Sequence, residues 1–265
     1  MDSNKINQAA EVLYKSRTLL KKIAKLPNDC IPQNKDEAYL IQDSLVKKHL
    51  SMNKGTSIIG KKVGCTNKAA QMQINVNEPF YGNILSHYSS KSNSIIESKN
   101  FFSPFIEPEF SFKIKETLDI SKAPYSSDEV FNSIHSVLPT IELVDSRFED
   151  WTVVGINNLI ADNSANAYWI YGEEIHELQS FNFSDHPVIL YVNDKVVDRG
   201  NSNNVLDNPV NSLTWLINTL ASQGKSLPTD SYISTGTCTP AIPLNINDNV
   251  CADFGKLGQV KFNFI

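Results

Sequence analysis

The sequence has few cysteines, and the four that it contains show no functional spacing. Cys30, Cys65, Cys238 and Cys251 match no zinc-binding pattern and no CxxC redox pair. In a chain of this size such cysteines are typical of reduced thiols rather than of a disulfide framework. We therefore expect a cytoplasmic protein with four free thiols.

Long apolar runs and concentrations of positive charge are also absent. No apolar run approaches the roughly 20 residues that span a membrane, and the first five residues lack the pattern of a signal peptide. The formal net charge is −5, and the one basic run, Lys21-Lys22 with Lys25, fits the solvated face of a helix. We expect neither a membrane nor a nucleic acid as a partner.

What is present predicts an α+β fold, since apolar residues make up 41% of the chain and can bury a core. Helical spacing predicts a helix over about residues 6–26 and a second one that begins after Asn34, with Glu37 as its capping partner. The other predicted elements are strands over 57–64, 106–115, 138–145, 167–171 and 260–264 and near Tyr232 and Val250, helices over 67–72, 126–135, 154–160 and 209–224, a hairpin at Asn193-Asp194 and a loop over 77–82. We expect a single domain over residues 1–265, with a helical part at 1–52 and a β-rich body at 56–265.

Two glutamates share one face of the strand predicted over residues 106–115. Because side chains alternate along a strand, Glu107 and Glu109 project together, opposite an apolar face. Their carboxylates repel each other unless a cation or a shared proton lies between them. Pro108 donates no ladder hydrogen bond, which predicts an edge, a bulge or a strand start. The alternative is that both acids face water on a half-exposed strand.

A third acid, Glu142, is the only charged residue among residues 138–144. A carboxylate in an apolar strand is costly to bury unless it is paired or bound to a metal. Three carboxylates without a nearby Cys/His cluster suit a hard, oxygen-binding ion such as Mg²⁺ or Mn²⁺. The pattern therefore predicts a metal site formed by Glu107, Glu109 and Glu142.

A lysine pair lies near the end of a glycine-bracketed strand, Gly60-Lys61-Lys62-Val63-Gly64. Lys61 and Lys62 face opposite sides, so at least one of them points inward. An inward lysine can bind a carboxylate or carry a proton; the alternative is a lysine whose stem is buried while its ammonium group reaches water. The polar run over residues 161–166 also has two interpretations: it is a loop that ends a helix, or it forms the wall of a pocket.

Together these segments resemble the 2-keto-4-pentenoate hydratase and 4-oxalocrotonate decarboxylase family, within the fumarylacetoacetate hydrolase-like superfamily. The matching motifs follow in order from about residue 35 and are Gly60-Lys61-Lys62-Val63-Gly64-Cys65-Thr66, Pro79-Phe80-Tyr81-Gly82, Ile106-Glu107-Pro108-Glu109, Leu138 to Arg147, Asp150-Trp151, Ala161-Asp162-Asn163, Asn208-Pro209 with Trp215-Leu216, and Thr229-Asp230 through Ser234-Thr235-Gly236.

The resemblance implies a β-rich roll with peripheral helices, often assembled as a homo-oligomer. It implies Mg²⁺ or Mn²⁺ bound by the three glutamates, and a small 2-oxo acid or 2-hydroxydienoate from aromatic breakdown as substrate. Such a substrate would offer its carboxylate and 2-oxo oxygen to the ion, which acts as a Lewis acid. Lys62, with a pKa lowered beside a cation, would bind the carboxylate or transfer a proton. The predicted catalytic residues are Lys62 and Ser164, and the predicted substrate-binding residues are Lys62, Phe80, Asn163, Arg147 and Thr235.

Two positions depart from the family pattern. Phe80 stands where hydratases typically carry an acid, and Ala165 stands where a hydroxyl residue is common. We predict a metal-dependent hydro-lyase of the 2-keto-4-pentenoate hydratase type. The alternatives are a carboxy-lyase of the 4-oxalocrotonate decarboxylase type, a homologue that binds its ligand but has lost catalysis, and a role of the first 50 residues as a protein-interaction helical pair.

Overall fold

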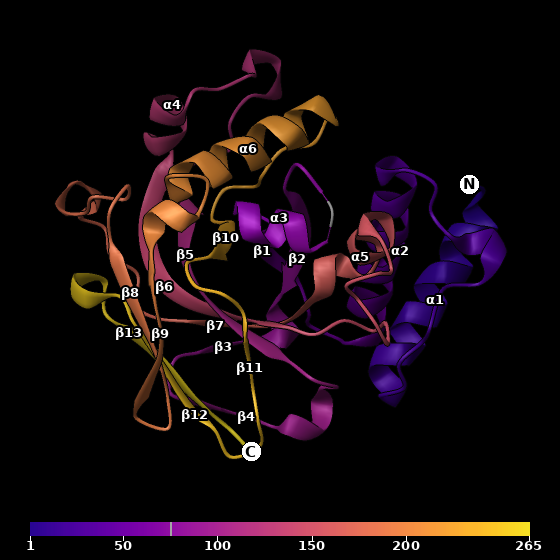
Figure 1. Ribbon diagram of the computed structural model, residues 1–265. Helices are drawn as coiled ribbons and strands as arrows, with labels where there is room; N and C mark the ends of the chain where they lie inside the picture. Colours follow the sequence, from indigo (N-terminus) through magenta and orange to yellow (C-terminus); the bar gives the residue numbers. More distant parts are fainter. Residues whose placement is uncertain (75) are drawn as a thin grey trace.

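Two β-sheets and six α-helices make up the part of the chain that the computed structural model describes, residues 1–74 and 76–265 apart from the side chains at positions 69 and 73 (Figure 1). The larger sheet has the order β2-β1-β10-β5-β6-β7-β3, with β11 paired to β5. Its strands are β1 (Ile58–Gly64), β2 (Phe80–Leu85), β3 (Ser89–Lys91), β5 (Phe105–Ile114), β6 (Ile134–Val144), β7 (Asn166–Tyr171), β10 (Tyr232–Thr237) and β11 (Ile242–Pro243).

The smaller sheet has the order β4-β13-β12-β8-β9. Its strands are β4 (Ser94–Ile96), β8 (Pro187–Val192), β9 (Lys195–Asn201), β12 (Asn249–Asp253) and β13 (Gln259–Phe264). The helices are α1 (Ser3–Leu19), α2 (Lys35–Met52), α3 (Lys68–Gln73), α4 (Ser127–Phe131), α5 (Ile156–Ala161) and α6 (Pro209–Ser222). The predicted α+β class is confirmed. None of the helices that the structure describes is long and apolar enough to cross a membrane.

The main hydrophobic core joins residues of both sheets. Phe110 and Phe112 of β5 are fully buried, and the ring of Phe110 meets the edge of Phe254 with 5.2 Å between centroids. Phe262 of β13 belongs to the same cluster. The alternation predicted for β5 therefore places its apolar side chains in this core and leaves its two glutamates on the opposite face of the sheet.

Helix α2 packs against both α1 and α5, on one side of the sheets (Figure 1). Their shared core contains small and branched side chains that are almost fully buried, including Ala9, Leu13, Ile41, Leu45 and Ala161. The apolar faces of the first two helices are therefore used within the chain itself.

Helix α1 is shorter than predicted. It ends at Leu19, and Leu20 takes a left-handed conformation with a φ of 49°. Further on, the backbone N–H of Ile23 donates to the carbonyl oxygen of Arg147 at 3.0 Å. Residues 21–26, including the basic run, thus lie outside the helix, because pairing with a distant segment overrides the local helical spacing.

Two further boundaries were predicted wrongly. Residues 80–82, predicted as loop, form the start of β2, where they pair with β1. The helix that begins after Ser126 ends at Phe131 and not at His135, because Ile134 already pairs with β5. Its capping box, between Ser126 and the Glu129 side chain, is confirmed.

Pro108 lies in the interior of the larger sheet rather than at an edge. Strand β5 is flanked by β6 on one side and by β10 and β11 on the other, and Pro108 lies opposite Ile141. Beside it, the register of β10 shifts between Ser234 and Thr237. The N–H of Cys238 donates to the carbonyl oxygen of Pro108 at 2.9 Å. Of the three predicted settings, the proline therefore occupies the one next to a bulge.

Candidate metal centre

Five neighbouring strands of the larger sheet contribute to one cluster of charged and polar side chains. In sheet order the contributing strands are β1, β10, β5, β6 and β7. Glu107 of β5 lies directly opposite Glu142 of β6, and Lys62 of β1 lies beside Ser234 of β10. Strand alternation puts these side chains on the face away from the phenylalanine core.

The three predicted metal ligands come together in this cluster. One carboxylate oxygen from each of Glu107, Glu109 and Glu142 lies within 4.8 Å of the others. Glu142 is fully buried, Glu109 is 1% exposed and Glu107 is half-buried. The alternative of two acids facing water therefore does not hold for Glu109. Three carboxylates at this separation need a positive counter-charge or bound protons.

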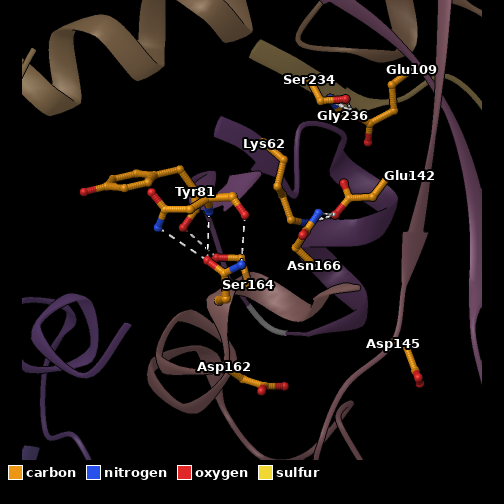
Figure 2. A network of polar contacts seen from close by, with 12 residues as sticks. Lys62, Tyr81, Glu109, Glu142, Asp145, Asp162, Ser164, Asn166, Ser234 and Gly236 are labelled. Carbon is orange, nitrogen blue, oxygen red and sulfur yellow. Dashed lines mark hydrogen bonds and ion pairs between the residues drawn. The ribbon is translucent and has the colours of Figure 1, made fainter. Parts of the chain in front are cut away.

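In the two most deeply buried carboxylates, Glu109 and Glu142, one oxygen accepts hydrogen bonds from the protein (Figure 2). Asn166 Nδ2 donates to Glu142 Oε1 at 2.9 Å, and Lys62 Nζ lies 3.3 Å from the same oxygen. Ser234 Oγ donates to Glu109 Oε2 at 2.5 Å, and the N–H of Gly236 donates to it at 3.0 Å.

The other oxygen of each of these carboxylates has no hydrogen-bond partner in the part of the chain that the structure describes. These two atoms, Glu109 Oε1 and Glu142 Oε2, are both buried. A buried carboxylate oxygen without a partner carries a large desolvation penalty. A divalent ion would remove that penalty, and a ligand set made only of oxygens fits Mg²⁺, Mn²⁺ or Ca²⁺. The residues present therefore fit a hard divalent cation.

The electrostatics of the cluster agree with a missing positive charge. Burial raises the pKa of Glu107 to about 7, against the opposing charge of Lys62 and with a contribution from Glu142. Burial, followed by the charges of Glu142 and Glu107, raises the pKa of Glu109 well above its ordinary value. Burial disfavours charged Lys62, but the three carboxylates outweigh it and raise the Lys62 pKa. The lowered pKa was expected for this lysine beside a cation, and it stays a prediction for the metal-bound protein.

A cavity of about 960 Å³ opens beside the cluster and is lined by Lys62 and Glu107 among others. This volume is typical of sites for small molecules. Part of the lining is apolar, formed by Phe80, Ile74, Leu159 and Trp215, and part is made of side-chain amides, from Asn67, Gln71, Asn203 and Asn204. The cavity therefore offers an apolar surface next to a charged one.

Two further predicted residues reach this cavity, Phe80 and Ser164. Ser164 is almost fully buried, and its hydroxyl donates to the carbonyl oxygen of Tyr81 at 2.6 Å (Figure 2). While this bond is in place, the hydroxyl can only accept a hydrogen bond from a ligand. Ala165, the second departure from the family pattern, also lines the cavity.

Arg147 and Asn163 are not among the described residues that line the cavity. Arg147 is 3% exposed and forms an ion pair with Asp162. The amide of Asn163 accepts from the N–H of Asn83 at 2.8 Å and donates to its carbonyl oxygen at 2.9 Å. The polar atoms of Arg147 and Asn163, both predicted to bind substrate, therefore bond to other parts of the protein outside the described lining of the cavity.

Thr235 was predicted to bind substrate, but its neighbours Ser234 and Gly236 are the residues that contact Glu109. Its hydroxyl donates to the carbonyl oxygen of Phe110 at 2.8 Å, on the other face of β10. Gly236 has a φ of 105°, and a Cβ atom there would lie 1.9 Å from Thr66 Oγ1, so only glycine fits. Sequence reasoning missed Ser234 and Gly236, as it missed Asn166. Strand alternation would have identified the first two if the register of β10 had been known.

Three clustered carboxylates, two of them buried, beside a cavity of this size define a candidate divalent-metal centre for a small ligand. No family model matches the sequence. The chain is 28% identical over 248 residues to 4-oxalocrotonate decarboxylase of Pseudomonas sp. (strain CF600), with 92% of this chain and 90% of that protein covered. It is 26% identical over 257 residues to 2-keto-4-pentenoate hydratase of Paraburkholderia xenovorans (strain LB400), with 97% and 94% covered.

Solved structures give the same result. The 4-oxalocrotonate decarboxylase from Pseudomonas putida G7, complexed with magnesium and adipate, has a TM-score of 0.93 at 28% identity, with 100% of this chain and 99% of that chain covered. A putative fumarylacetoacetate hydrolase family protein from Yersinia pestis CO92 shares the fold, with a TM-score of 0.59 at 15% identity over 78% of this chain and 94% of that chain. The predicted resemblance to the hydratase and decarboxylase family and its fumarylacetoacetate hydrolase-like fold is confirmed.

Proposed function

We propose that this chain is a lyase that depends on a divalent metal ion and acts on a small 2-oxo or 2-hydroxydienoic acid. One observation carries the proposal: two buried carboxylate oxygens, Glu109 Oε1 and Glu142 Oε2, lack a partner among the described residues and lie in a cluster beside a cavity. The relatives that match nearly the whole chain are lyases by name. One solved relative holds magnesium and adipate.

Glu107, Glu109 and Glu142 are the proposed ligands of Mg²⁺ or Mn²⁺. When bound, the ion supplies a Lewis acid that polarises the 2-oxo oxygen of the substrate. The chain keeps the ligand oxygens in place through the donors on β7 and β10, Asn166, Ser234 and the Gly236 N–H. Donors that orient ligands in this way raise metal affinity.

Lys62 is the proposed proton donor and carboxylate-binding residue. It lines the cavity, and its ammonium group lies 3.3 Å from Glu142. Without a bound metal ion, the nearby carboxylates raise the pKa of Lys62. Its ammonium group can pair with a substrate carboxylate or give a proton to a substrate carbon.

The first candidate reaction is the addition of water to a 2-hydroxydienoate, the activity in the name of several relatives. This reaction places a proton on one carbon and a hydroxyl group on another, so water must also lose a proton. Lys62 can supply the first proton. Ser164 could take part in the second transfer only after it gives up its hydrogen bond to Tyr81.

Decarboxylation is the second candidate, and Phe80 favours it. This reaction breaks one carbon–carbon bond, releases CO₂ and places one proton on the carbon that remains, which Lys62 can supply. Phe80 lines the cavity where the hydratase pattern has an acid. An aromatic ring moves no proton, and it makes this wall drier, which disfavours the addition of water.

Two assays in parallel test the proposal and separate the two reactions. The purified chain with Mg²⁺ is given 2-hydroxypentadienoate or 4-oxalocrotonate, and loss of substrate and release of CO₂ are followed. We expect turnover in one assay at least, and its loss with EDTA. The proposal fails if the chain turns over neither substrate and does not bind oxalate with Mg²⁺ or Mn²⁺ present.

Lys62→Met and Phe80→Asp refine the same experiment. Loss of a proton donor should lower turnover by roughly 10²–10⁴-fold in Lys62→Met. Lys61→Met is the matched control, since Lys61 faces the other side of β1 and donates to Asn83 Oδ1 at 2.8 Å. Gain of hydration in Phe80→Asp would show that the aromatic ring suppresses that reaction. Robust hydration by the unaltered chain would show that the missing acid is not needed.

A further inference from the structure

Two histidines and a glutamate come together at the opposite end of β6 from the carboxylate cluster. His135 lies at the start of β6, and Glu174 and His176 lie in the segment that follows β7. A bridge between Val137 and Ile175 draws the two segments together through backbone hydrogen bonds of 3.0 and 2.8 Å. One ligand atom from each of the three residues lies within 4.8 Å of the others.

This cluster is distinct from the carboxylate site. His135 and Glu142 are seven residues apart on β6, which corresponds to roughly 23 Å along an extended strand. His135 and His176 are exposed and Glu174 is half-buried, whereas two of the three glutamates of the carboxylate cluster are buried. Neither the proposed reaction nor the cavity beside it uses any of these three residues.

Two neighbouring hydroxyl groups hold the carboxylate of the cluster in place. Glu174 Oε1 accepts from the hydroxyl group of Tyr232 at 2.8 Å, and Glu174 Oε2 accepts from Ser136 Oγ at 2.8 Å. The two imidazole rings meet edge to face, with 4.8 Å between their centroids. Metal-binding residues are commonly fixed by such second hydrogen bonds, so the Glu174 carboxylate is already oriented without an ion.

The protonation pattern also suits an ion. His176 Nδ1 lies 3.4 Å from the carbonyl oxygen of His135, which can only accept, so in the neutral ring Nδ1 carries the proton and Nε2 keeps its lone pair. Burial opposes the charged form of Glu174, but bonds from Tyr232 and Ser136 and the charge of Lys113 outweigh it and lower its pKa. The carboxylate is therefore ionised at neutral pH.

Lys113 lies beside the cluster, and its positive charge works against a cation there. Its ammonium group lies 3.5 Å from Glu174 Oε1, but it lies equally close to Asp230 Oδ1. Its charge is therefore shared between two carboxylates. Glu174 Oε2 accepts from the neutral Ser136 hydroxyl and has no ammonium partner among the residues that the structure describes.

We propose that His135, Glu174 and His176 form a second metal site, which binds a borderline transition-metal ion such as Zn²⁺ or Ni²⁺. Two imidazoles and one carboxylate are ligands that Zn²⁺ takes at ordinary distances. Nitrogen ligands favour Ni²⁺, Cu²⁺ and Zn²⁺ over Mn²⁺, and Mg²⁺ prefers oxygen. The two sites thus differ in chemistry, with hard ions at the buried carboxylates and borderline ions at the exposed histidines. A bound ion would fasten the start of β6 to the segment after β7.

Zinc titration in excess Mg²⁺ tests the proposal on the full chain, with Mg²⁺ keeping the carboxylate site occupied. Calorimetry should detect binding of one zinc ion per chain. The affinity for this ion should fall at least tenfold in His135→Ala and in His176→Ala, and its binding should be lost in the double variant. Glu174→Gln should weaken it too, although its single amide oxygen keeps an acceptor for only one of the hydroxyl groups of Tyr232 and Ser136. His87→Ala is the matched control, because His87 is also exposed but lies outside the cluster.

A second readout keeps the result independent of folding and of the lyase reaction. Melting temperatures without zinc should be unchanged in the histidine variants, because both rings are exposed, and zinc should raise the melting temperature only of chains with the intact cluster. Activity with Mg²⁺ should be the same in all of them. The proposal is wrong if the double variant binds zinc as the unaltered chain does, or if His87→Ala loses as much binding.

Discussion

Two groups of charged side chains are buried next to each other in this protein, and they differ in how well their charges are paired. In the first group, Arg147 forms an ion pair with Asp162, and its guanidinium also donates to the carbonyl oxygens of Asp145 at 2.7 Å and Asn166 at 3.2 Å. In the second, the cluster of Glu107, Glu109 and Glu142, one lysine faces three carboxylates.

The difference separates a structural role from a functional one. Asp162 accepts from the Arg147 side chain, from its backbone N–H at 3.0 Å and from Ser146 Oγ at 3.1 Å, so both of its oxygens are satisfied. Glu109 and Glu142 each keep one oxygen without a partner among the described residues. A fully paired cluster stabilises the fold by itself, whereas an underpaired one is stable only with an added cation or with bound protons. Figure 2 shows Asp162 apart from the two glutamates.

Asp162→Asn should cause the largest loss of stability. The change keeps the shape of the side chain but leaves the buried Arg147 guanidinium without its counter-charge. Removal of one partner of a buried ion pair costs about 3–5 kcal/mol in the free energy of unfolding. Urea denaturation measures it, with Glu177→Gln at an exposed carboxylate as the control. A loss below about 1 kcal/mol would mean that this cluster is not the structural one.

Metal addition and Glu109→Gln test the other cluster. Mg²⁺ at a hundredfold excess over its Kd should stabilise the unaltered chain by about 2.7 kcal/mol, and EDTA should reverse this. Glu109→Gln should lose the effect. Without metal, however, this variant should be at least as stable as the unaltered chain, because it removes one of three repelling acids. The comparison breaks down if Glu109→Gln destabilises the metal-free chain as much as Asp162→Asn does.

A pH prediction concerns His49, whose pKa is affected by the charge of Arg147 in the first group. Burial, with the charges of Arg17 and Arg147, lowers the pKa of His49 to about 3. The unfolded chain binds this proton near pH 6.5, while the folded chain does so only near pH 3. Unfolding therefore takes up a proton between these values, and stability falls as the pH falls, by about 1.4 kcal/mol per pH unit.

Denaturation at pH 7 and pH 5 measures the contribution of His49. This group should account for about 2 kcal/mol of the stability lost between these values. His49→Gln should show a smaller loss than the unaltered chain by about that amount. The difference between the two chains isolates His49, because the raised pKa of Glu107 acts in the opposite direction and is common to both. An equal pH dependence in the two chains would contradict the prediction.

The three glutamates of the cluster could be identified from the sequence because their signals are local. The alternation of β5 places Glu107 and Glu109 on one face, and Glu142 stands alone among apolar residues. The same rule turns at least one of Lys61 and Lys62 inward, and the structure places Lys62 in the cluster. Each of these inferences needs only the residues immediately around the position.

The supporting contacts could not be predicted, because they depend on how distant segments pair. Ser234 meets Glu109 across 125 positions of sequence. A buried charged residue in a motif can serve either substrate binding or the stability of the fold. Arg147, which was expected at the substrate, forms an ion pair with Asp162. The end of α1 was missed for a similar reason, since Ile23 pairs with a segment more than 100 residues away.

Asn166→Ala should have the smallest effect on stability, and it tests how the two clusters are joined. Asn166 Nδ2 donates to Glu142 Oε1 at 2.9 Å, while its carbonyl oxygen accepts from Arg147 at 3.2 Å and from Arg17 at 3.1 Å. The substitution removes only the side-chain donor, so the arginine contacts remain. The unfolding free energy should fall by about 1 kcal/mol, as for one hydrogen bond.

Metal affinity should fall more clearly in the same variant, by roughly 10–100-fold, because the freed Glu142 carboxylate is no longer oriented toward the ion. Calorimetric titration with Mg²⁺ measures it. Asn204→Ala is the matched control, since Asn204 lines the cavity but donates to the carbonyl oxygen of Cys238. If Asn166→Ala leaves metal affinity unchanged and loses several kcal/mol of stability, this residue belongs to the arginine cluster alone. If metal affinity falls and stability barely changes, one asparagine serves the structural cluster with its backbone and the metal site with its side chain.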